Sequence, residues 1–264
     1  MTGKKLRLER IRDRESGNFL VVPMDHGVTI GPARGLENID TTIRDIADGG
    51  GDSVLVHKGV AERGYLEADR DIGLVVHVNG ATEIGPDPNR KVTVASVKRA
   101  VRAGADAVSF HINVGSDTEP EQLRELGRVS DECDDYGMPL LAMTYVRGHD
   151  VDSQDVDAIA HATRLGAELG ADVVKTSYTG DPDEYERVID GCPVPVVIAG
   201  GPKAETRREV LQDVRDAIDV GARGVAMGRN VFQQDDVRGM TRALSLVVHE
   251  GASVDDALEE AVTA

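Results

Sequence analysis

Short apolar segments recur along the chain and alternate with longer, more polar ones. Each segment is rich in Val, Ile and Leu and is apolar almost throughout, not only at every second position. A continuous apolar run of this length is typical of a strand that is buried on both faces of a parallel sheet. The sequence predicts eight such strands, at Phe19–Met24, Ser53–Val56, Ile72–Val78, Ala107–Ile112, Pro139–Thr144, Asp172–Val174, Val194–Ala199 and Gly224–Met227.

Segments with apolar residues at helical spacing lie between the strands. Residues that favour helix starts precede two of them, Ser153 and Thr118, and glycines follow three of them, Gly137, Gly170 and Gly221. A phrase such as AGADAV at 103–108 marks the turn from a helix to the next strand. The predicted helices include Ile39–Asp48, Val92–Ala103, Glu121–Tyr136, Gln154–Leu169, Glu205–Val220 and a last one at Val254–Val262.

Eight repeats of a strand followed by a helix predict an α/β fold, the (β/α)₈ TIM barrel. The length of 264 residues suits one barrel, so we expect a single domain over residues 1–264 with an extra C-terminal helix. An open, doubly wound sheet is the alternative that the pattern leaves.

The amino-acid composition limits the kinds of molecule that could bind this protein. The net charge of −17 disfavours nucleic acid and anionic membranes as partners. Abundant acids, few lysines and few aromatic residues suggest adaptation to high salt, where counterions screen repulsion between acidic groups. The two cysteines, Cys133 and Cys192, form no CxxC pair, and Met1–Arg14 has no apolar core of a signal peptide, so we expect a cytoplasmic protein.

Polar residues follow every predicted strand. In a TIM barrel the carboxyl ends of the strands form one rim, and active sites are built there. The sequence therefore predicts a site that combines Asp25-His26-Gly27, His57-Lys58-Gly59, His77, Asn79, His111, Asn113, Tyr145, Arg147, Lys175, Gly200-Gly201-Pro202-Lys203 and Gly228-Arg229-Asn230.

Two glycine-rich turns follow the last two predicted strands. They expose backbone N–H groups, and a short helix starting near Asn230 would add its positive end. Lys203 or Arg229 could supply charge. We expect phosphate to bind at these turns.

Neither a metal nor an organic cofactor is expected. The seven histidines show no HxH or HxxxH spacing, although His26, His57, His77 and His111 follow different strands and could converge on one ion. No GxGxxG follows the first strand, so a dinucleotide is not expected either.

A lysine, a tyrosine and an aspartate on the rim suggest amine catalysis. A neutral lysine attacks a ketone to form an iminium, which withdraws electrons so that the adjacent C–C bond can break. Lys175 comes one strand before the phosphate turns and is the preferred nucleophile; Lys58 and Lys203 are the competitors. Tyr145 could move the proton during bond cleavage, and Asp25 could act as a base.

Seven segments resemble the archaeal class I aldolases of the DeoC/FbaB type, and within them the 2-amino-3,7-dideoxy-D-threo-hept-6-ulosonate synthases. The resemblance covers nearly the whole chain and rests on VPMDHGVTIGPARGL (22–36), VLVHKG (54–59), AVSFHINVGSDTE (107–119), MTYVRG (143–148), ADVVKTSYTG (171–180), VVIAGGPK (196–203) and GVAMGRNVFQ (224–233).

The resemblance implies a Schiff base on Lys175, a proton donor in Tyr145 and a proton acceptor in Asp25. It implies that the substrate contacts Asp25, His26, Gly27, Val28, Thr29, Tyr145, Val146 and Arg147, and that phosphate contacts Gly200, Gly201, Gly228 and Arg229. Similar proteins often carry Pro where this chain has Val146, which leaves the conformation of that loop open.

The implied reaction is a transaldolase-type step that serves aromatic amino acid biosynthesis. A hydroxyacetone-type fragment passes from 6-deoxy-5-ketofructose 1-phosphate to L-aspartate 4-semialdehyde, and the protein is expected to be a homo-oligomer, possibly a decamer. Two alternatives stay open: a fructose-1,6-bisphosphate or other sugar-phosphate aldolase, and a barrel that binds a phosphorylated ligand without catalysis.

Overall fold

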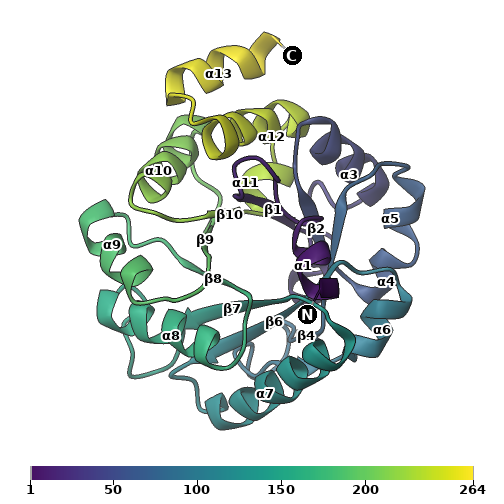
Figure 1. The fold of residues 1–264 in the computed structure, drawn as a ribbon, viewed down its shortest axis with the longest axis vertical. Coiled ribbons are helices and arrows are strands. Elements are labelled where there is room, and N and C mark those ends of the chain that lie inside the picture. Colours follow the sequence, from purple (N-terminus) through teal and green to yellow (C-terminus); the bar gives the residue numbers. More distant parts are fainter. Residues whose placement is uncertain (1, 264) are drawn as a thin grey trace.

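The computed structural model describes residues 2–263 and contains one closed barrel of eight parallel strands (Figure 1). The predicted TIM barrel is therefore confirmed, and the open sheet is excluded. Neighbouring strands follow the order β1-β10-β9-β8-β7-β6-β3-β2 around the barrel. Their bounds are β1 Phe19–Pro23, β2 Ser53–His57, β3 Gly73–His77, β6 Ala107–Val114, β7 Leu140–Val146, β8 Val173–Ser177, β9 Val196–Ala199 and β10 Gly224–Ala226.

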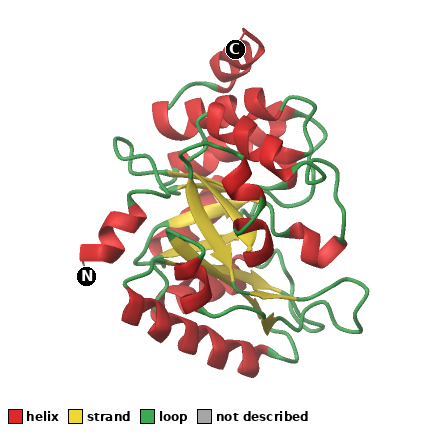
Figure 2. Ribbon diagram, turned by 90° about the vertical axis from the view of Figure 1, so that its right-hand side faces the viewer, coloured by secondary structure: helices red, strands yellow, loops and turns green. Residues whose placement is uncertain are grey.

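Helices surround the barrel on the outside, and the N-terminal helix lies at one end of its axis (Figures 1 and 2). The helices are α1 Thr2–Leu8, α2 His26–Ile30, α3 Ile39–Asp48, α4 Lys58–Ala61, α5 Gly64–Glu67, α6 Val97–Arg102, α7 Glu119–Tyr136, α8 Val156–Glu168, α9 Pro182–Asp190, α10 Arg207–Asp219, α11 Arg229–Phe232, α12 Val237–Ser245, the π-helix η1 Leu246–Glu250 and the extra C-terminal helix α13 Val254–Thr263.

Apolar side chains pack on both faces of the sheet, which explains why the strands are apolar almost throughout. Along β1, Phe19 and Val21 point into the barrel, whereas Leu20 and Val22 join the larger core between sheet and helices. Ile11, from the segment after α1, is fully buried in the inner cluster. This inner layer is filled by side chains, so the open space of the barrel is confined to its rim.

The recurring phrase before the strands has a structural cause. Gly104 and Gly170 end helices with φ of +81° and +92°, a conformation that glycine adopts at little cost. The aspartate two residues later accepts a hydrogen bond from the preceding strand: Asp106 Oδ2 from Leu74 N at 3.0 Å, and Asp172 Oδ2 from Leu140 N at 2.9 Å. The phrase thus fixes the register of adjacent strands.

One predicted helix is partly wrong. Residues Val92–Thr93 form β5, which pairs antiparallel with β4, Asn79–Gly80, and α6 begins only at Val97. The Ser96 side chain caps α6 by accepting a hydrogen bond from Arg99 N. The β-branched residues Val92 and Val94 suit an extended hairpin. The predicted helix included them because the spacing of apolar residues does not show where a helix begins.

Two predicted helix caps also differ from the structure. Asp155, not Ser153, caps α8, since its carboxylate accepts a hydrogen bond from Asp157 N. Thr118 does precede α7, but its side chain makes no capping bond to the helix backbone. No helix within the described residues is long and apolar enough to cross a membrane. A single domain over residues 1–264 stays a prediction.

Candidate active site

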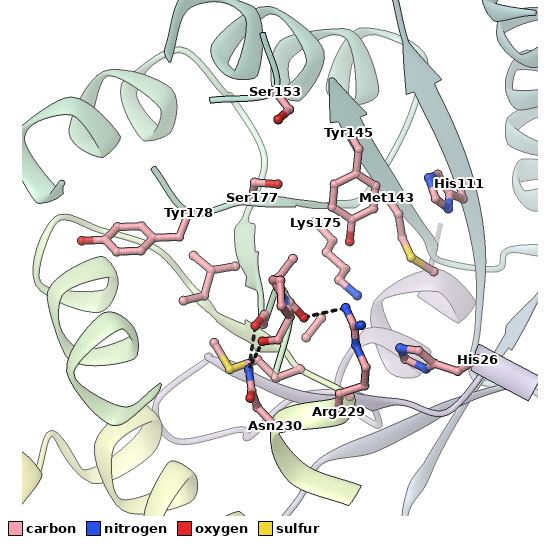
Figure 3. Close-up of a pocket in the computed structure, with 18 of the residues that line it drawn as sticks. His26, His111, Met143, Tyr145, Ser153, Lys175, Ser177, Tyr178, Arg229 and Asn230 are labelled. Carbon is pink, nitrogen blue, oxygen red and sulfur yellow. Dashed lines mark hydrogen bonds between the residues drawn. The ribbon is translucent and has the colours of Figure 1, made fainter. Parts of the chain in front are cut away.

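A cavity of about 710 Å³ opens among the residues that follow the barrel strands (Figure 3). It receives side chains from both halves of the chain, as expected for the carboxyl rim of a TIM barrel. Its lining includes most of the residues that the sequence singled out: Asp25, His26, Thr29, His111, Tyr145, Val146, Arg147, Lys175, Gly200, Gly201, Gly228, Arg229 and Asn230.

Lys175 and Tyr145 point into the same part of this cavity (Figure 3). Lys175 lies within β8, not after it, and only 7% of the residue is exposed. It pairs in register with Met143 on β7, and Tyr145 is two residues further along, so Met143 and Tyr145 share the inward face of that strand. The amine and the phenol are thus held by adjacent strands, which limits their relative movement.

Asp25 follows β1 and is partly buried, with 20% of its side chain exposed. Burial raises the pKa of its carboxyl, but the positive charges of His77, His26 and Lys175 act against this and lower the pKa to about 2. Asp25 is therefore an anion at neutral pH and faces the same cavity as Lys175.

His77, at the end of β3, lies next to Asp25. Its Nε2 is 3.9 Å from Asp25 Oδ2, and its Nδ1 is 2.8 Å from the Ser109 hydroxyl. Burial lowers the pKa of His77 to about 4, which leaves the ring neutral at pH 7. At 3.9 Å the two groups make no hydrogen bond, and a neutral His77 does not offset the charge of Asp25.

We expect this buried ring to make the fold sensitive to acid. The folded-state pKa of about 4 is below the ordinary 6.5, so the unfolded chain binds the additional proton between these values. Stability is then full above pH 6.5 and falls as the pH drops toward 4, by roughly 3 kcal/mol for this group. Urea denaturation across this range should give a shallower fall for His77→Asn than for the wild type; an identical fall would contradict the assignment.

Tyr145 is held by two neighbours. The His111 ring packs edge-on against it with a centroid distance of 5.0 Å, and the Arg147 guanidinium lies 4.8 Å from its ring centroid. Burial lowers the pKa of His111 well below its usual value, with Lys91 and Arg147 acting in the same direction. His111 Nε2 is 2.8 Å from Asn113 Oδ1, which fixes the ring.

The two glycine turns are tied together by α11. Asn230 donates to the carbonyls of Gly200 and Pro202, at 2.6 and 3.2 Å, and accepts from Ala204 N at 2.8 Å. Arg229 donates to Gly201 O at 2.9 Å. A Cβ on Gly200 would lie 2.9 Å from Met227 Cγ, so the close packing of the two turns requires glycine there. The turns form a fixed, cation-bearing wall of the cavity.

Some predicted residues do not reach the cavity. Gly27 and Val28, in α2, are absent from its lining. Lys58 donates to Val94 O at 2.5 Å and does not line the cavity. Lys203 donates to Gln233 O at 3.0 Å and does not line the cavity, so neither lysine competes with Lys175 by position.

The sequence missed three charged residues of the lining, Glu83, Lys91 and Asp213. Glu83 and Lys91 lie between β4 and β5, in the hairpin that was partly predicted as a helix, and Asp213 lies on α10. Because the chain has few lysines, Lys91 could have been considered as a functional residue. It follows none of the predicted strands, however, so it was not placed on the rim. The four strand-end histidines do not form a metal site; residues 2–263 contain no group of three or more His, Cys, Asp or Glu side chains that could hold an ion.

A model of the DeoC/LacD family of aldolases matches residues 19–234. The chain belongs to this family. Among its relatives, the 2-amino-3,7-dideoxy-D-threo-hept-6-ulosonate synthase of Halobacterium salinarum is 48% identical over 259 residues, which cover 98% of this chain and 96% of that protein. Synthase 1 of the same name from Archaeoglobus fulgidus is 45% identical over 98% of this chain and 96% of its own length.

A solved structure adds the mechanistic class. An archaeal fructose-1,6-bisphosphate aldolase with its catalytic Lys covalently bound to the carbinolamine intermediate of the substrate superposes with a TM-score of 0.86. It is 32% identical, and the match covers 93% of this chain and 99% of that chain. This member of the DeoC/LacD family is accordingly an aldolase-type enzyme of the Schiff-base class, as the sequence predicted.

Proposed function

We propose that this aldolase is a 2-amino-3,7-dideoxy-D-threo-hept-6-ulosonate synthase and that Lys175 forms its Schiff base. The observation that carries the proposal is the buried Lys175 facing Tyr145 and the ionised Asp25 in one cavity. The names of the two relatives at 48% and 45% identity support the choice of product.

Imine formation comes first in the proposed reaction. The Lys175 amine adds to the C5 ketone of 6-deoxy-5-ketofructose 1-phosphate. Asp25 accepts the proton that the nitrogen sheds and passes it to the former carbonyl oxygen. With a second proton from solvent, this oxygen leaves as water and an iminium remains. The substrate then contacts Asp25, His26 and Thr29 on one side and the stretch from Tyr145 to Arg147 on the other.

Exchange of the aldehyde follows. The C3–C4 bond breaks, its electrons move to the iminium nitrogen, and the C3 hydroxyl proton passes to the Tyr145 oxygen as the phenol proton moves on to solvent. A phosphorylated three-carbon dicarbonyl leaves, and a hydroxyacetone-type enamine remains on Lys175. This enamine attacks the aldehyde of L-aspartate 4-semialdehyde, Tyr145 returns the proton to the aldehyde oxygen, and water releases the product.

A second candidate is a fructose-1,6-bisphosphate or other sugar-phosphate aldolase that uses the same lysine. The glycine turns favour it, because a phosphate subsite at Gly200, Gly201, Gly228 and Arg229 suits a phosphate on the fragment that stays on Lys175. In the synthase reaction the phosphate is on the fragment that leaves.

Product analysis in concentrated KCl tests the proposal. The enzyme is given 6-deoxy-5-ketofructose 1-phosphate with L-aspartate 4-semialdehyde and, separately, fructose 1,6-bisphosphate. The amino-dideoxy-heptulosonate with little triose phosphate is the expected result. Triose phosphate from the bisphosphate, with no amino product, would replace the synthase by the second candidate.

The glycine turns give a prediction of their own. Asn230→Ala removes three hydrogen bonds that hold the turns. We expect the Kd for a ketose phosphorylated on the retained fragment to rise about tenfold, because the phosphate subsite loses its fixed geometry. Calorimetry with fructose 1,6-bisphosphate measures this binding whether or not the sugar is cleaved, and Gln234→Ala is the control, since that side chain donates to Asn230 O and does not line the cavity. An unchanged Kd would argue against phosphate binding at these turns.

A further inference from the structure

The cavity has a second positively charged end that neither the lysine nor the glycine turns explain. Lys91 and Arg147 both line it, and each acts electrostatically on the other and on His111. Burial, the charge of Arg147 and the weaker counteraction of nearby acids leave the pKa of Lys91 below its ordinary value. Among the residues described, neither side chain has a hydrogen bond or an ion pair within 4.0 Å, and the Arg147 guanidinium lies over the Tyr145 ring. Two cations that line one pocket without a bonded acid favour an anionic ligand group.

This end lies across the barrel from the glycine turns. The hairpin that carries Lys91 connects β3 to β6, and these strands are on the opposite side of the barrel from β9 and β10. Lys175, on β8, lies between Tyr145 and Arg229 in the close-up (Figure 3). A substrate attached to Lys175 therefore has one end toward Arg229 and the other toward Tyr145, Arg147 and Lys91.

The chemistry assigns the Tyr145 end to the exchanged aldehyde. One C–C bond breaks and another forms at the same enamine carbon. The departing and the incoming aldehyde therefore occupy the same place in the cavity. Their oxygen must meet the group that moves its proton, which is Tyr145 in the proposed function. Since Tyr145 contacts Arg147 and His111, the rest of the exchanged fragment extends toward the hairpin.

The hairpin also carries a carboxylate. Glu83 lines the cavity and is near enough to Lys91 to act on its charge, but the two form no ion pair within 4.0 Å in the described part of the chain. The two cations Lys91 and Arg147 are complementary to the carboxylate of an α-amino acid, and the Glu83 carboxylate is complementary to its ammonium group. A phosphate would be attracted by Lys91 and Arg147 alone, whereas an amino acid also offers an ammonium group to Glu83.

The hairpin is held rigidly enough to present these groups. Asn89 O accepts hydrogen bonds from Asn113 Nδ2 at 2.8 Å and from Gln122 Nε2 at 2.9 Å. Glu83 N donates to Thr29 O at 3.0 Å, and Val94 N donates to Val78 O at 2.7 Å. Backbone anchors on both arms lower the cost of ordering the side chains when a ligand binds.

We propose that Lys91, Arg147 and Glu83 form the acceptor subsite and recognise the amino-acid head of the incoming aldehyde. Lys91 and Arg147 bind its carboxylate, and Glu83 binds its ammonium group. The same cations receive the phosphate of the departing dicarbonyl before the acceptor arrives. The inference rests on the proposed function and adds the residues that determine acceptor specificity.

Three acceptors separate the contributions at saturating donor: L-aspartate 4-semialdehyde, 4-oxobutanoate, which lacks the amino group, and 3-aminopropanal, which lacks the carboxylate. For Lys91→Gln we expect kcat/KM to fall about ten- to a hundredfold with the first two and to stay within about twofold with 3-aminopropanal. For Glu83→Gln we expect the preference for L-aspartate 4-semialdehyde over 4-oxobutanoate to fall about tenfold.

Arg90→Gln is the matched control, because it removes the same charge from the same hairpin at a side chain that does not line the cavity. Borohydride trapping on Lys175 shows that each variant is folded and forms the imine. Equal losses with all three acceptors, or none, would overturn the subsite while leaving the proposed function in place. If the wild-type enzyme transferred nothing to L-aspartate 4-semialdehyde but cleaved fructose 1,6-bisphosphate, both the acceptor subsite and the proposed function would be overturned.

Discussion

Replacing Lys175 by Met should lower kcat by at least about 10⁴-fold, because the amine beside Tyr145 and Asp25 is lost and Lys91, the other lysine of the lining, lies on the hairpin between β4 and β5. Methionine has a similar length and suits a residue that is 7% exposed, so the barrel should keep its fold. Trapping with borohydride and substrate, followed by mass spectrometry, should label the wild type once, on the peptide containing Lys175, and leave Lys175→Met unlabelled. Substrate binding, measured by calorimetry, should persist.

Lys98→Met is the control, since Lys98 is exposed on α6 and lies outside the cavity. Its activity and labelling should match the wild type. If the Lys175→Met enzyme were still labelled and active, the Schiff base would belong to another lysine. If the wild type bound substrate without any label or turnover, the non-catalytic alternative would be favoured.

Tyr145→Phe should lower the rate of C–C cleavage by roughly 10²–10⁴-fold while imine formation stays intact. The ring would keep its contacts with His111 and Arg147, so only the hydroxyl is lost. Rapid-quench measurements can separate the two steps: trapped imine should accumulate at the wild-type rate, and release of the dicarbonyl should be slow.

Tyr178→Phe provides a matched loss of one phenol at the same cavity. Tyr178 packs against Tyr185, with a ring centroid distance of 5.0 Å, and lies away from Lys175 in Figure 3, so its loss should have little effect on cleavage. Cleavage by Tyr145→Phe at near the wild-type rate would remove Tyr145 from the proton transfer and, with it, the argument that places the exchanged aldehyde beside the hairpin.

The position of Asp25 shows how charge and burial combine at this site. Its pKa is about 2 because, at the low pH where it titrates, its electrostatic interactions with His77, His26 and Lys175 outweigh the burial that alone would raise that pKa. None of these neighbours is close to Asp25 in sequence except His26. The sequence predicted that the histidines and Lys175 lie at one rim, because each is at the end of a strand. Only the closed barrel determines which of these side chains face one another.

The sequence by itself determined the barrel and most of the site. Eight apolar runs, the helices between them and the glycines of the helix-to-strand turns are local features, and each depends on residues close together in the chain. Because every strand of a closed parallel barrel ends at the same rim, the residues after the runs had to converge, and Lys175, Tyr145 and Asp25 were found in this way.

The tertiary structure alone decided the rest. The hairpin of β4 and β5 interrupts the repeat, and its pairing depends on contacts between residues about a dozen positions apart, which a helical period does not detect. Lys91 and Glu83 therefore had no predicted place. The preference for Lys175 over Lys58 and Lys203 came from the sequence, and it agrees with the structure, in which neither of these two lysines lines the cavity. A pattern along the chain predicts which elements form; which side chains share a cavity is set by the packing of elements that are distant in sequence.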